Sequence, residues 1–465
     1  MKFKENRIHY FSFDQENIII DINSGLVHSV STLVYKFVDQ WRQSGCELAA
    51  VPSLLYWQKK SGESADPSEL QEIASEINEM IRDGSLMSEA PELEGFRMPE
   101  DHVVKALCLH VAHDCNLRCR YCFAGTGAFG GDRSLMSYEV GKAALDFLFD
   151  ASGKRQHIEV DYFGGEPLMN FDVVKKLVLY GRDESKRRGK VLKQTLTTNG
   201  VLLAGEILDF LNREDVALVL SLDGRKEVHD RMRPSANDKG SYDVIMPHLQ
   251  AAAASRQWDN YYVRGTFTRC NKDFFEDIRH MLDAGFDLVS EEPVVAPPEE
   301  PYAFKEEDLP ELYEQYEKLA RFYIERQKAG KPFLFFHFNL DLDRGPCLPK
   351  RLSGCGAGRE YLAVAPEGTL YPCHQFVGNP DFAVGHVRSG ITKPETGKVF
   401  GEAHVLEKEK CRNCWARFYC SGGCHANAWN FNKDLKKPYD LGCELEKKRL
   451  ECAMWIQVKQ QDLQD

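Results

Sequence analysis

The residues best suited to chemistry in this chain are three cysteines on one short segment. Cys115, Cys119 and Cys122 follow the pattern Cys-x3-Cys-x2-Cys, and no fourth cysteine follows on the same segment. A [4Fe–4S] cluster usually takes four cysteine ligands, so three would leave one iron open. An open coordination position distinguishes a reactive metal site from a structural one. The spacing therefore predicts a reactive iron–sulfur centre.

Zinc is the alternative for this segment. Zinc accepts mixed sulfur and nitrogen ligands, and His113 lies two residues before the first cysteine. The spacing alone does not exclude such a site. The residues around it favour the cluster, because Tyr121 precedes the last cysteine and Gly164-Gly165-Glu166-Pro167 follows further along the chain.

The two motifs together resemble those of the radical S-adenosylmethionine (SAM) enzymes. The resemblance implies that Cys115, Cys119 and Cys122 carry the catalytic cluster, whose free iron chelates the amino and carboxylate groups of SAM. An electron passed to the sulfonium then gives a 5′-deoxyadenosyl radical. The residues that the resemblance assigns to cofactor binding are Tyr121, Gly164, Gly165, Glu166, Asn199, Ser221 and Arg233.

The elements that must position this site alternate between strands and helices over residues 102–305. The pattern predicts strands at 107–111, 157–163, 194–198, 216–222, 261–268 and 286–290. We expect an α/β fold in which six β/α units form a partial (β/α)6 TIM barrel of the radical SAM type. The first cysteine follows the first strand, at the strand end where barrel enzymes place their chemistry. A barrel with an open side would admit a large substrate such as a peptide.

A second cysteine-rich region is expected at residues 345–445. Its order, from Cys355 through Gly368 and Cys373 to a closing group of five cysteines, resembles the SPASM extension of radical SAM enzymes that act on peptides. The resemblance implies two auxiliary [4Fe–4S] clusters, which makes three clusters in all. The first would take Cys355, Cys373 and Cys424, with Cys347 as the candidate fourth ligand, and the second would take Cys411, Cys414, Cys420 and Cys443. Without Cys347, the first would have a free iron that could hold a substrate thiolate.

Residues 1–90 are expected to form a winged-helix-like unit. A hairpin is predicted over 17–30, a helix over 33–41, and a second helix from its N-cap Asp66 to Gly84. This unit resembles the peptide-recognition domain (RRE, PqqD-like) that binds a leader peptide as an added strand. A structural cap or a dimerisation unit is the alternative. Residues 306–344 are expected to form a bridging helix and strand, and residues 446–465 a C-terminal helix.

Composition sets the broad class. A formal net charge of −12 argues against a nucleic-acid partner, and no apolar run is long enough to cross a membrane. The start of the chain lacks the apolar stretch of a secretory signal, and fifteen cysteines then indicate metal sites rather than disulfides. We therefore expect a cytoplasmic protein. Four cysteines match no motif and are expected to be buried structural thiols: Cys46, Cys108, Cys270 and Cys452.

One residue that departs from the family pattern narrows the choice of reaction. His374 follows Cys373, where sulfatase-maturing members of the group have a carboxylate base, so sulfatase-type oxidation is disfavoured. The run 119–127 and the element around Cys373 resemble maturases of SCIFF peptides (ranthipeptides). That resemblance implies a thioether cross-link from a cysteine sulfur to a carbon of another residue, threonine in this subfamily.

The resemblance also implies the partners. The substrate would be a ribosomally synthesised, cysteine-rich precursor peptide bound through its leader, and the electron donor would be of the flavodoxin or ferredoxin type. Other radical modifications stay open, namely a carbon–carbon cross-link, epimerisation or sulfatase-type oxidation. A non-enzymatic zinc- and cysteine-rich peptide-binding protein is a further alternative.

Overall fold

The computed structural model describes residues 7–45, 66–90, 103–257, 259–340 and 348–461, together with residues 2, 4, 342 and 463. Cys46, Cys347 and most of the expected linker before residue 103 lie outside these residues. Within the described part of the chain, no helix is both long and apolar enough to cross a membrane.

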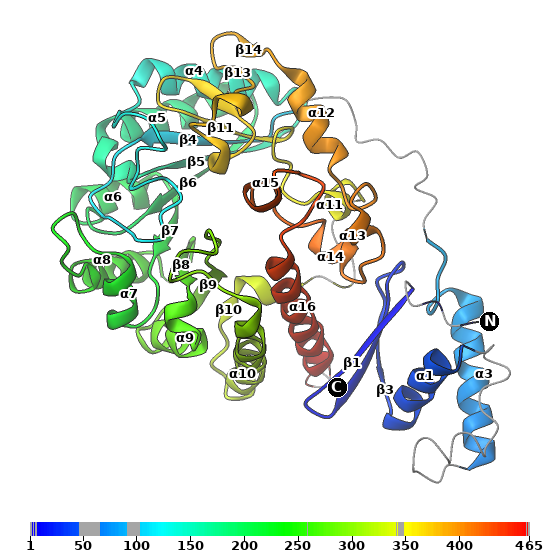
Figure 1. The fold of residues 1–465 in the computed structure, drawn as a ribbon. Helices are drawn as coiled ribbons and strands as arrows, with labels where there is room; N and C mark the ends of the chain where they lie inside the picture. The colour runs from blue at the N-terminus through cyan, green and yellow to red at the C-terminus, as the bar shows by residue number, and fades with distance from the viewer. Residues whose placement is uncertain are drawn as a thin grey trace.

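The centre of the molecule is a curved parallel sheet wrapped by helices (Figure 1). Its six consecutive strands are β4 (Ala106–Ala112), β5 (His157–Gly164), β6 (Val191–Thr198), β7 (Ala217–Ser221), β8 (Tyr261–Phe267) and β9 (Leu288–Pro293), each parallel to the next. The helices between them are α4 (Tyr138–Ala151), α5 (Phe171–Arg187), α6 (Glu206–Arg213), α7 (Lys226–Met232), α8 (Tyr242–Ser255) and α9 (Phe274–Asp283). All six predicted strands are present, so the expectation of a partial α/β barrel is confirmed.

The two faces of the sheet have different surroundings. Leu107, Leu109 and Val111 of β4 are buried in the large core that also contains the inner faces of the helices. Cys108 alternates with them and belongs to a second cluster that also contains Cys373. Because alternate residues of a strand point to opposite faces, Cys108 lies on the concave side of the barrel.

The sheet continues beyond the six predicted strands at both ends. β10 (Leu334–Phe335) pairs with β9, and β11 (Tyr361–Val364) pairs with β4, both in parallel. The antiparallel strands β12 (Thr369–Tyr371), β13 (Gly385–His386) and β14 (Gly390–Ile391) extend the β11 edge. These strands have two to four residues each, too few for a periodic pattern to show in the sequence. Pairing of β11 with β4 places the second cysteine region beside the first.

The N-terminal unit is a three-stranded antiparallel sheet with two helices. Its elements are β1 (Ile8–Phe13), β2 (Glu16–Asp21), β3 (Val27–Val30), α1 (Thr32–Ser44) and α3 (Pro67–Asp83). As predicted, Asp66 caps α3 by accepting a hydrogen bond from the Ser68 amide, and Gly84 ends it at φ +81°. The sequence did not predict β1, because the β1–β2 turn uses Asp14 and Gln15 at positive φ in place of glycine.

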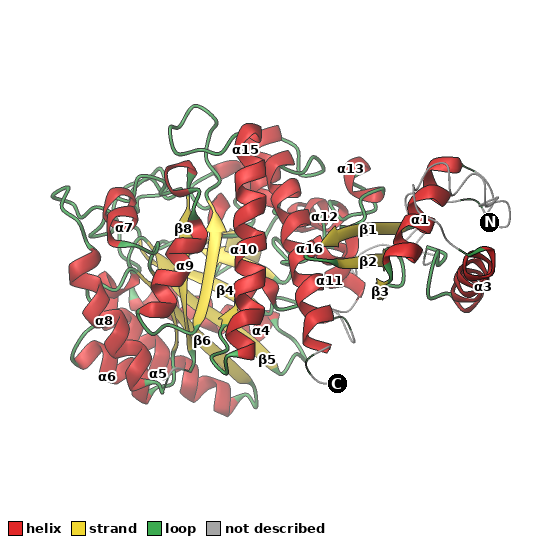
Figure 2. Ribbon diagram, turned by 90° about the horizontal axis from the view of Figure 1, so that it is seen from below, coloured by secondary structure: helices red, strands yellow, loops and turns green. Residues whose placement is uncertain are grey.

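The C-terminal helix α16 (Asp440–Gln461) lies beside this N-terminal sheet and beside α10 (Leu309–Lys328), as Figures 1 and 2 show. His9 Nε2 lies 3.0 Å from Glu451 Oε1, and the rings of Phe13 and Trp455 are 4.7 Å apart. α16 begins six residues before the expected boundary at 446, so Cys443 lies in its first turn. Five shorter helices complete the second cysteine region: α11 (Leu348–Leu352), α12 (Pro394–Glu402), α13 (Glu409–Arg412), α14 (Arg417–Cys420) and α15 (His425–Asn432).

Candidate active site and metal centres

The cysteine loop (residues 113–127) is held against the end of β5 by backbone contacts. The Gly165 amide donates to the Ala112 carbonyl at 2.8 Å, and the Glu166 amide donates to the Asp114 carbonyl at 2.9 Å. A Cβ atom at Gly164 would lie 2.2 Å from the Ala112 oxygen, and one at Gly165 would lie 2.2 Å from the Asp114 oxygen. The two glycines are therefore required for this loop to approach the strand, and the cofactor contact that the resemblance implies for them stays a prediction.

The three thiols of the loop share one partly buried site. Cys115 Sγ accepts the Leu117 amide at 3.4 Å and lies 3.7 Å from Asn199 Nδ2. Burial, with a contribution from the Cys122 thiol, raises the pKa of Cys115 to about 12 and that of Cys119 to about 11. These thiols do not ionise unaided at neutral pH, but a coordinated metal deprotonates a thiol outright.

The donor set fits an iron–sulfur cluster with three cysteine ligands. The three thiols come from one loop and act on one another electrostatically, as the ligands of one polynuclear centre must. Among the described residues, no group of three or more His, Cys, Asp or Glu side chains is arranged around a single metal ion.

Tyr121, Asp223 and Arg233 form a buried polar group beside this loop. The Tyr121 hydroxyl donates to Asp223 Oδ2 at 2.5 Å and accepts from Arg233 Nη1 at 2.9 Å, and Arg233 Nη1 lies 3.5 Å from Asp223 Oδ1. Arg233 Nε is buried and has no hydrogen-bond partner among the described residues. An unmet buried donor on a cation fits an anionic ligand group, and the contact of Arg233 with SAM stays a prediction.

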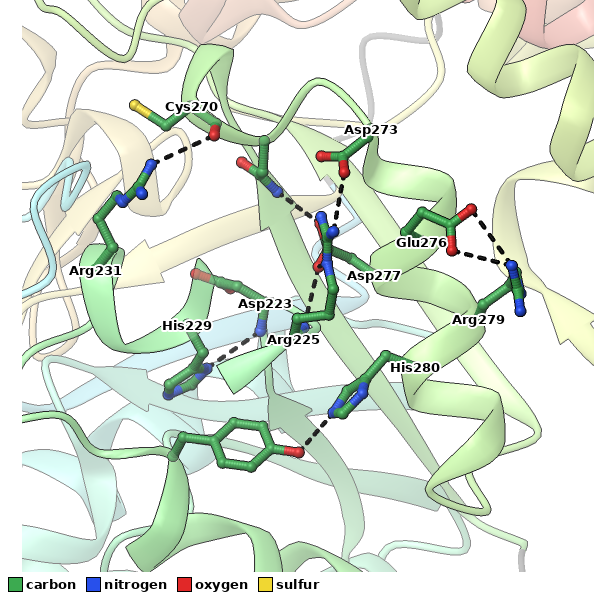
Figure 3. A network of polar contacts seen from close by, with 12 residues as sticks. Asp223, Arg225, His229, Arg231, Cys270, Asp273, Glu276, Asp277, Arg279 and His280 are labelled. Atoms are coloured by element: carbon green, nitrogen blue, oxygen red, sulfur yellow. Dashed lines mark hydrogen bonds and ion pairs between the residues drawn. The ribbon is translucent and has the colours of Figure 1, made fainter. Parts of the chain in front are cut away.

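Figure 3 shows the network that fixes the segment after Ser221, the last residue of β7. The Asp223 amide donates to His229 Nδ1 at 3.3 Å. Arg225 donates through Nε to Asp277 Oδ1 at 2.8 Å and through Nη1 to Asp273 Oδ2 at 2.9 Å. These contacts join the start of α7 to α9, so Asp223 is held rigidly against the cysteine loop.

The carboxylate of Glu166 is already hydrogen-bonded to other residues of the protein. Its buried carboxylate accepts hydrogen bonds from the Leu168 amide, the Thr198 hydroxyl (2.8 Å) and the Asn199 amide (2.8 Å). Burial raises the pKa of Glu166 to about 7, and these hydrogen bonds oppose the rise. The side chain therefore ties the end of β5 to the end of β6, and its contact with the amino group of SAM stays a prediction.

The seven described cysteines of the second region separate into two groups. Burial is the main cause that raises the pKa of Cys373 to about 12, and the thiols that contribute to the rise are those of Cys424 and Cys355. We call Cys355, Cys373 and Cys424 the first auxiliary set. Both groups match the predicted ligand sets, and whether each holds a cluster stays a prediction.

The second auxiliary set consists of Cys411, Cys414, Cys420 and Cys443. Burial raises the pKa of Cys420 to about 12, and the Cys443 and Cys411 thiols add to the rise. Burial is the main cause that raises the pKa of Cys443 to about 11, and the Cys411 and Cys414 thiols contribute to the rise. These four residues lie on or beside α13, α14 and the first turn of α16.

A cavity of about 380 Å³ connects the two sets with the barrel. Its lining includes Cys355 and Cys424 of the first set, Cys420 and Cys443 of the second, and Glu292 at the end of β9. Because both sets contribute thiols to one cavity, the auxiliary region faces the carboxyl ends of the barrel strands.

His374 lies between the two cysteine regions. Its Nδ1 is 3.1 Å from the Tyr361 hydroxyl, and its ring centroid is 5.6 Å from Phe123 and 5.4 Å from Phe163. Phe123 follows the last cysteine of the loop, and Cys373 precedes His374. The sequence marked His374 only as a departure from a pattern, and its place between the two sites depends on the β11–β4 pairing that the sequence did not reveal.

The cysteines outside the motifs differ in exposure. Cys108 and Cys452 are buried, as expected. Cys270 is exposed, so the expectation of a buried structural thiol is wrong there; it lies in a surface 3-10 turn (Arg269–Asn271) capped by Thr268. Cys46 and the tentative ligand Cys347 lie outside the described residues.

Comparisons with known proteins agree with this geometry. Residues 109–288 match the model of the radical SAM superfamily. The radical SAM cyclopropyl synthase TigE of Paramaledivibacter caminithermalis is 21% identical and the alignment covers 77% of each chain. A cysteine-type anaerobic sulfatase-maturating enzyme of Clostridium novyi is 24% identical over 68% of this chain and 86% of its own.

A solved structure extends the likeness to nearly the whole fold. The crystal structure of Streptococcus suis SuiB bound to S-adenosylmethionine superposes with a TM-score of 0.54 at 18% identity, covering 95% of this chain and 100% of its own. The matched superfamily implies SAM and a [4Fe–4S] cluster, and the three loop thiols fit that cluster. The chain therefore contains a radical SAM domain, in residues 109–288.

Proposed function

We propose that this radical SAM protein is a peptide maturase that forms a thioether between a cysteine sulfur and a carbon of another residue, threonine by resemblance, in a ribosomally synthesised precursor. The observation that carries the proposal is the packing of the two cysteine regions against each other. Cys122 of the loop contacts the hydrophobic cluster that contains Cys373 of the first auxiliary set. A substrate thiol and a substrate carbon could thus be held between two metal centres.

The residues of the barrel have the task of holding the cofactor. Bound SAM and its cluster supply a carbon-centred radical that removes a hydrogen atom from the substrate. Asn199 contacts Cys115 through its side-chain amide, and the unpaired Nε of Arg233 would hold the cofactor's carboxylate together with Ser221. The Tyr121–Asp223 hydrogen bond keeps Arg233 in place from below the loop.

The residues of the first auxiliary set have the task of holding the cysteine side of the substrate. Cys355, Cys373 and Cys424 would carry a cluster, and if Cys347 does not ligate it, an iron is left for the substrate sulfur. His374 is fixed through Nδ1 by Tyr361, so its Nε2 is left to contact the substrate beside Cys373. The substrate thiol would lose its proton on binding the iron, and the auxiliary cluster would accept the one electron left over when the thiolate bonds to the carbon radical. The second set would carry the third cluster, which would pass that electron on.

The N-terminal unit supports a peptide substrate. β3 is one of the two edge strands of its sheet, and an edge strand offers backbone groups to an added peptide strand. A structure of Streptococcus suis SuiB bound to the precursor peptide SuiA has a TM-score of 0.52 with this chain and covers 94% of it. We propose that the precursor's leader adds to β3.

The test is product analysis with a precursor peptide, the first choice being a short cysteine-rich open reading frame next to this gene. Anaerobically reconstituted protein, SAM and dithionite should release 5′-deoxyadenosine and give a peptide that has lost two hydrogens and resists thiol alkylation. A product that has lost two hydrogens but still alkylates would indicate a carbon–carbon cross-link. An unchanged mass with altered stereochemistry would indicate epimerisation, and no 5′-deoxyadenosine would refute the radical SAM activity.

A further inference from the structure

The auxiliary region contains a fully buried lysine whose ammonium has no carboxylate partner. Lys408 has 0% of its surface exposed, and its Nζ donates to the Gly422 carbonyl at 2.6 Å. Among the described residues, no Asp or Glu oxygen lies within ion-pair distance of this ammonium. Burying an unpaired charge is costly, so a cation placed this way indicates a counter-charge of another kind.

The loop that binds Lys408 joins the two auxiliary sets. It runs from Cys420 of the second set to Cys424 of the first, and Ser421, Gly422 and Gly423 between them all have positive φ, at 58°, 88° and 72°. This left-handed turn directs the Gly422 carbonyl to the ammonium. A Cβ at Gly422 would lie 3.3 Å from Lys408 Nζ. The lysine is therefore held at the junction of the two sets.

Thiols from both sets act on this lysine. Burial lowers the pKa of Lys408, and Cys411 and Cys420 of the second set and Cys424 and Cys355 of the first oppose that shift when they carry negative charge. Free buried thiols are protonated, whereas thiols that ligate iron are anionic. The counter-charge of Lys408 thus appears when the auxiliary sets bind metal.

The neighbouring cations are arranged differently. Lys410 Nζ lies 2.6 Å from Asp440 Oδ1, Lys447 Nζ lies 2.8 Å from Glu444 Oε1, and Arg449 is paired with Glu446. Their charges are already balanced by carboxylates, and Lys410 is also nearly half exposed. Lys408 is set apart from them by its burial and by the absence of such a pair in the described chain.

We propose that Lys408 is the shared counter-ion of the two auxiliary iron–sulfur centres and that its fixed charge keeps both reduction potentials higher than they would otherwise be. The inference rests on the proposed assignment of the two cysteine sets. Adding an electron makes a centre more negative, and a buried cation at short range favours the reduced form because the interior screens charge poorly. Lys408 is a positioning residue in this role and does not touch the substrate.

The test uses full-length protein in which Cys115, Cys119 and Cys122 are replaced by alanine, so that only the auxiliary centres remain. Potentiometric titration followed by electron paramagnetic resonance should show both potentials lowered in Lys408→Met by about a tenfold change in the one-electron equilibrium, or about 59 mV. Lys408→Arg should restore most of the shift. Lys436→Gln is the matched control, because Lys436 is half exposed and paired with Glu407; it should leave both potentials unchanged.

A second measurement separates this role from a purely structural one. In metal-free protein Lys408→Met removes an uncompensated buried charge, so the melting temperature should stay equal or rise, while the increase on iron loading should become smaller. Equal losses of melting temperature in metal-free and loaded protein, or unchanged potentials at full iron content, would overturn the role of Lys408. If the parent binds no iron through the auxiliary sets, the cluster assignment itself fails and the proposal fails with it.

Discussion

The two cysteine regions bring their thiols together by different means. In the barrel, three thiols lie on one loop, and the loop is positioned by close backbone contacts with Gly164 and Gly165. In the second region, thiols that are up to 69 residues apart in the first set (Cys355 and Cys424) meet only because the chain folds back through short helices. A local site is visible in the sequence, while an assembled site depends on the whole fold.

The regions also differ in their uncompensated charge. In the barrel, both carboxylate oxygens of Glu291 in β9 are buried without a hydrogen-bond partner among the described residues. In the auxiliary region the cation Lys408 is fully buried and has no carboxylate partner among the described residues. Each region thus contains a buried ionisable group whose cost must be offset by protonation or by a ligand.

The largest effect expected from this comparison is a division of labour. Replacing Cys115, Cys119 and Cys122 by alanine should abolish 5′-deoxyadenosine release and peptide modification together, because no ligand set remains for the catalytic cluster. Replacing Cys355 and Cys373 should abolish cross-linking while 5′-deoxyadenosine release survives. The measurement is chromatography of both products from the same reaction, and loss of both activities in the second variant would break the comparison.

A single methyl group should impair the barrel site alone. In Gly165→Ala the new Cβ would lie 2.2 Å from the Asp114 carbonyl oxygen, so the cysteine loop must move. We expect 5′-deoxyadenosine release to fall at least about 100-fold and stability to fall by about 1–3 kcal/mol, the usual cost of overpacking. Iron bound by the auxiliary sets should be unaffected.

Gly131→Ala is the control for this variant. Its Cβ would meet nothing nearer than the Ala128 oxygen at 3.7 Å. It lies just beyond the same loop, so it should retain both cofactor cleavage and stability. If the two alanine variants behave alike, the close contact at Gly165 is not what positions the loop.

Replacing His374 should impair cross-linking and leave cofactor cleavage intact. In His374→Gln we expect cross-linking to fall about tenfold or more, equivalent to about 1.4 kcal/mol of transition-state stabilisation, because Nε2 no longer contacts the substrate. Cofactor cleavage in the absence of peptide should persist. Tyr361→Phe removes the hydroxyl that holds Nδ1 and should give a smaller loss. Rates for the peptide and for 5′-deoxyadenosine should be measured in parallel.

The smallest effect is expected at Glu291. Burial raises its pKa well above the ordinary value, and the carboxylates of Asp277, Asp223 and Glu292 add to the rise. A carboxyl group whose pKa is higher in the folded than in the unfolded state stabilises the fold at pH values below its unfolded pKa. This stabilisation is lost as the pH rises towards the folded-state pKa. Glu291→Gln should therefore raise the unfolding free energy at pH 8 by about 1 kcal/mol.

The pH dependence gives the check on Glu291. Chemical denaturation of the parent and of Glu291→Gln should differ more at pH 8 than at pH 5. A difference that is constant with pH would show that the carboxyl does not titrate in this range and would remove this half of the charge comparison.

How far the sequence predicts this molecule depends on the range of its interactions. The six barrel strands and the caps of α3 at Asp66 and Gly84 could be predicted, because they depend on local periodicity and local hydrogen bonds. The Tyr121–Asp223–Arg233 group and the hydrogen bonds of Glu166 could not, because their partners come from separate strands. The structure brings Asn199 to Cys115 and Arg233 to Tyr121, and the cofactor-binding roles of these residues stay predictions.

The failures have equally specific causes. β11 has four residues and no periodic signal, yet its pairing with β4 brings His374 beside Phe123. Cys270 was expected to be buried because free cysteines often are, but it lies in a short surface turn. In each case a tertiary arrangement decided what composition could not.

Helix α16 acts as a spacer with a definite length. It carries Cys443 in its first turn. Further along the helix, Glu451 contacts the N-terminal sheet, and Lys459 forms an ion pair with Glu16 of that sheet. At 1.5 Å per residue these contacts lie about 12 and about 24 Å along the axis from Cys443. A peptide that runs from the level of these contacts to the level of Cys443 would need about four to seven extended residues. The length of the helix would thus limit which part of a precursor can reach the metal centres.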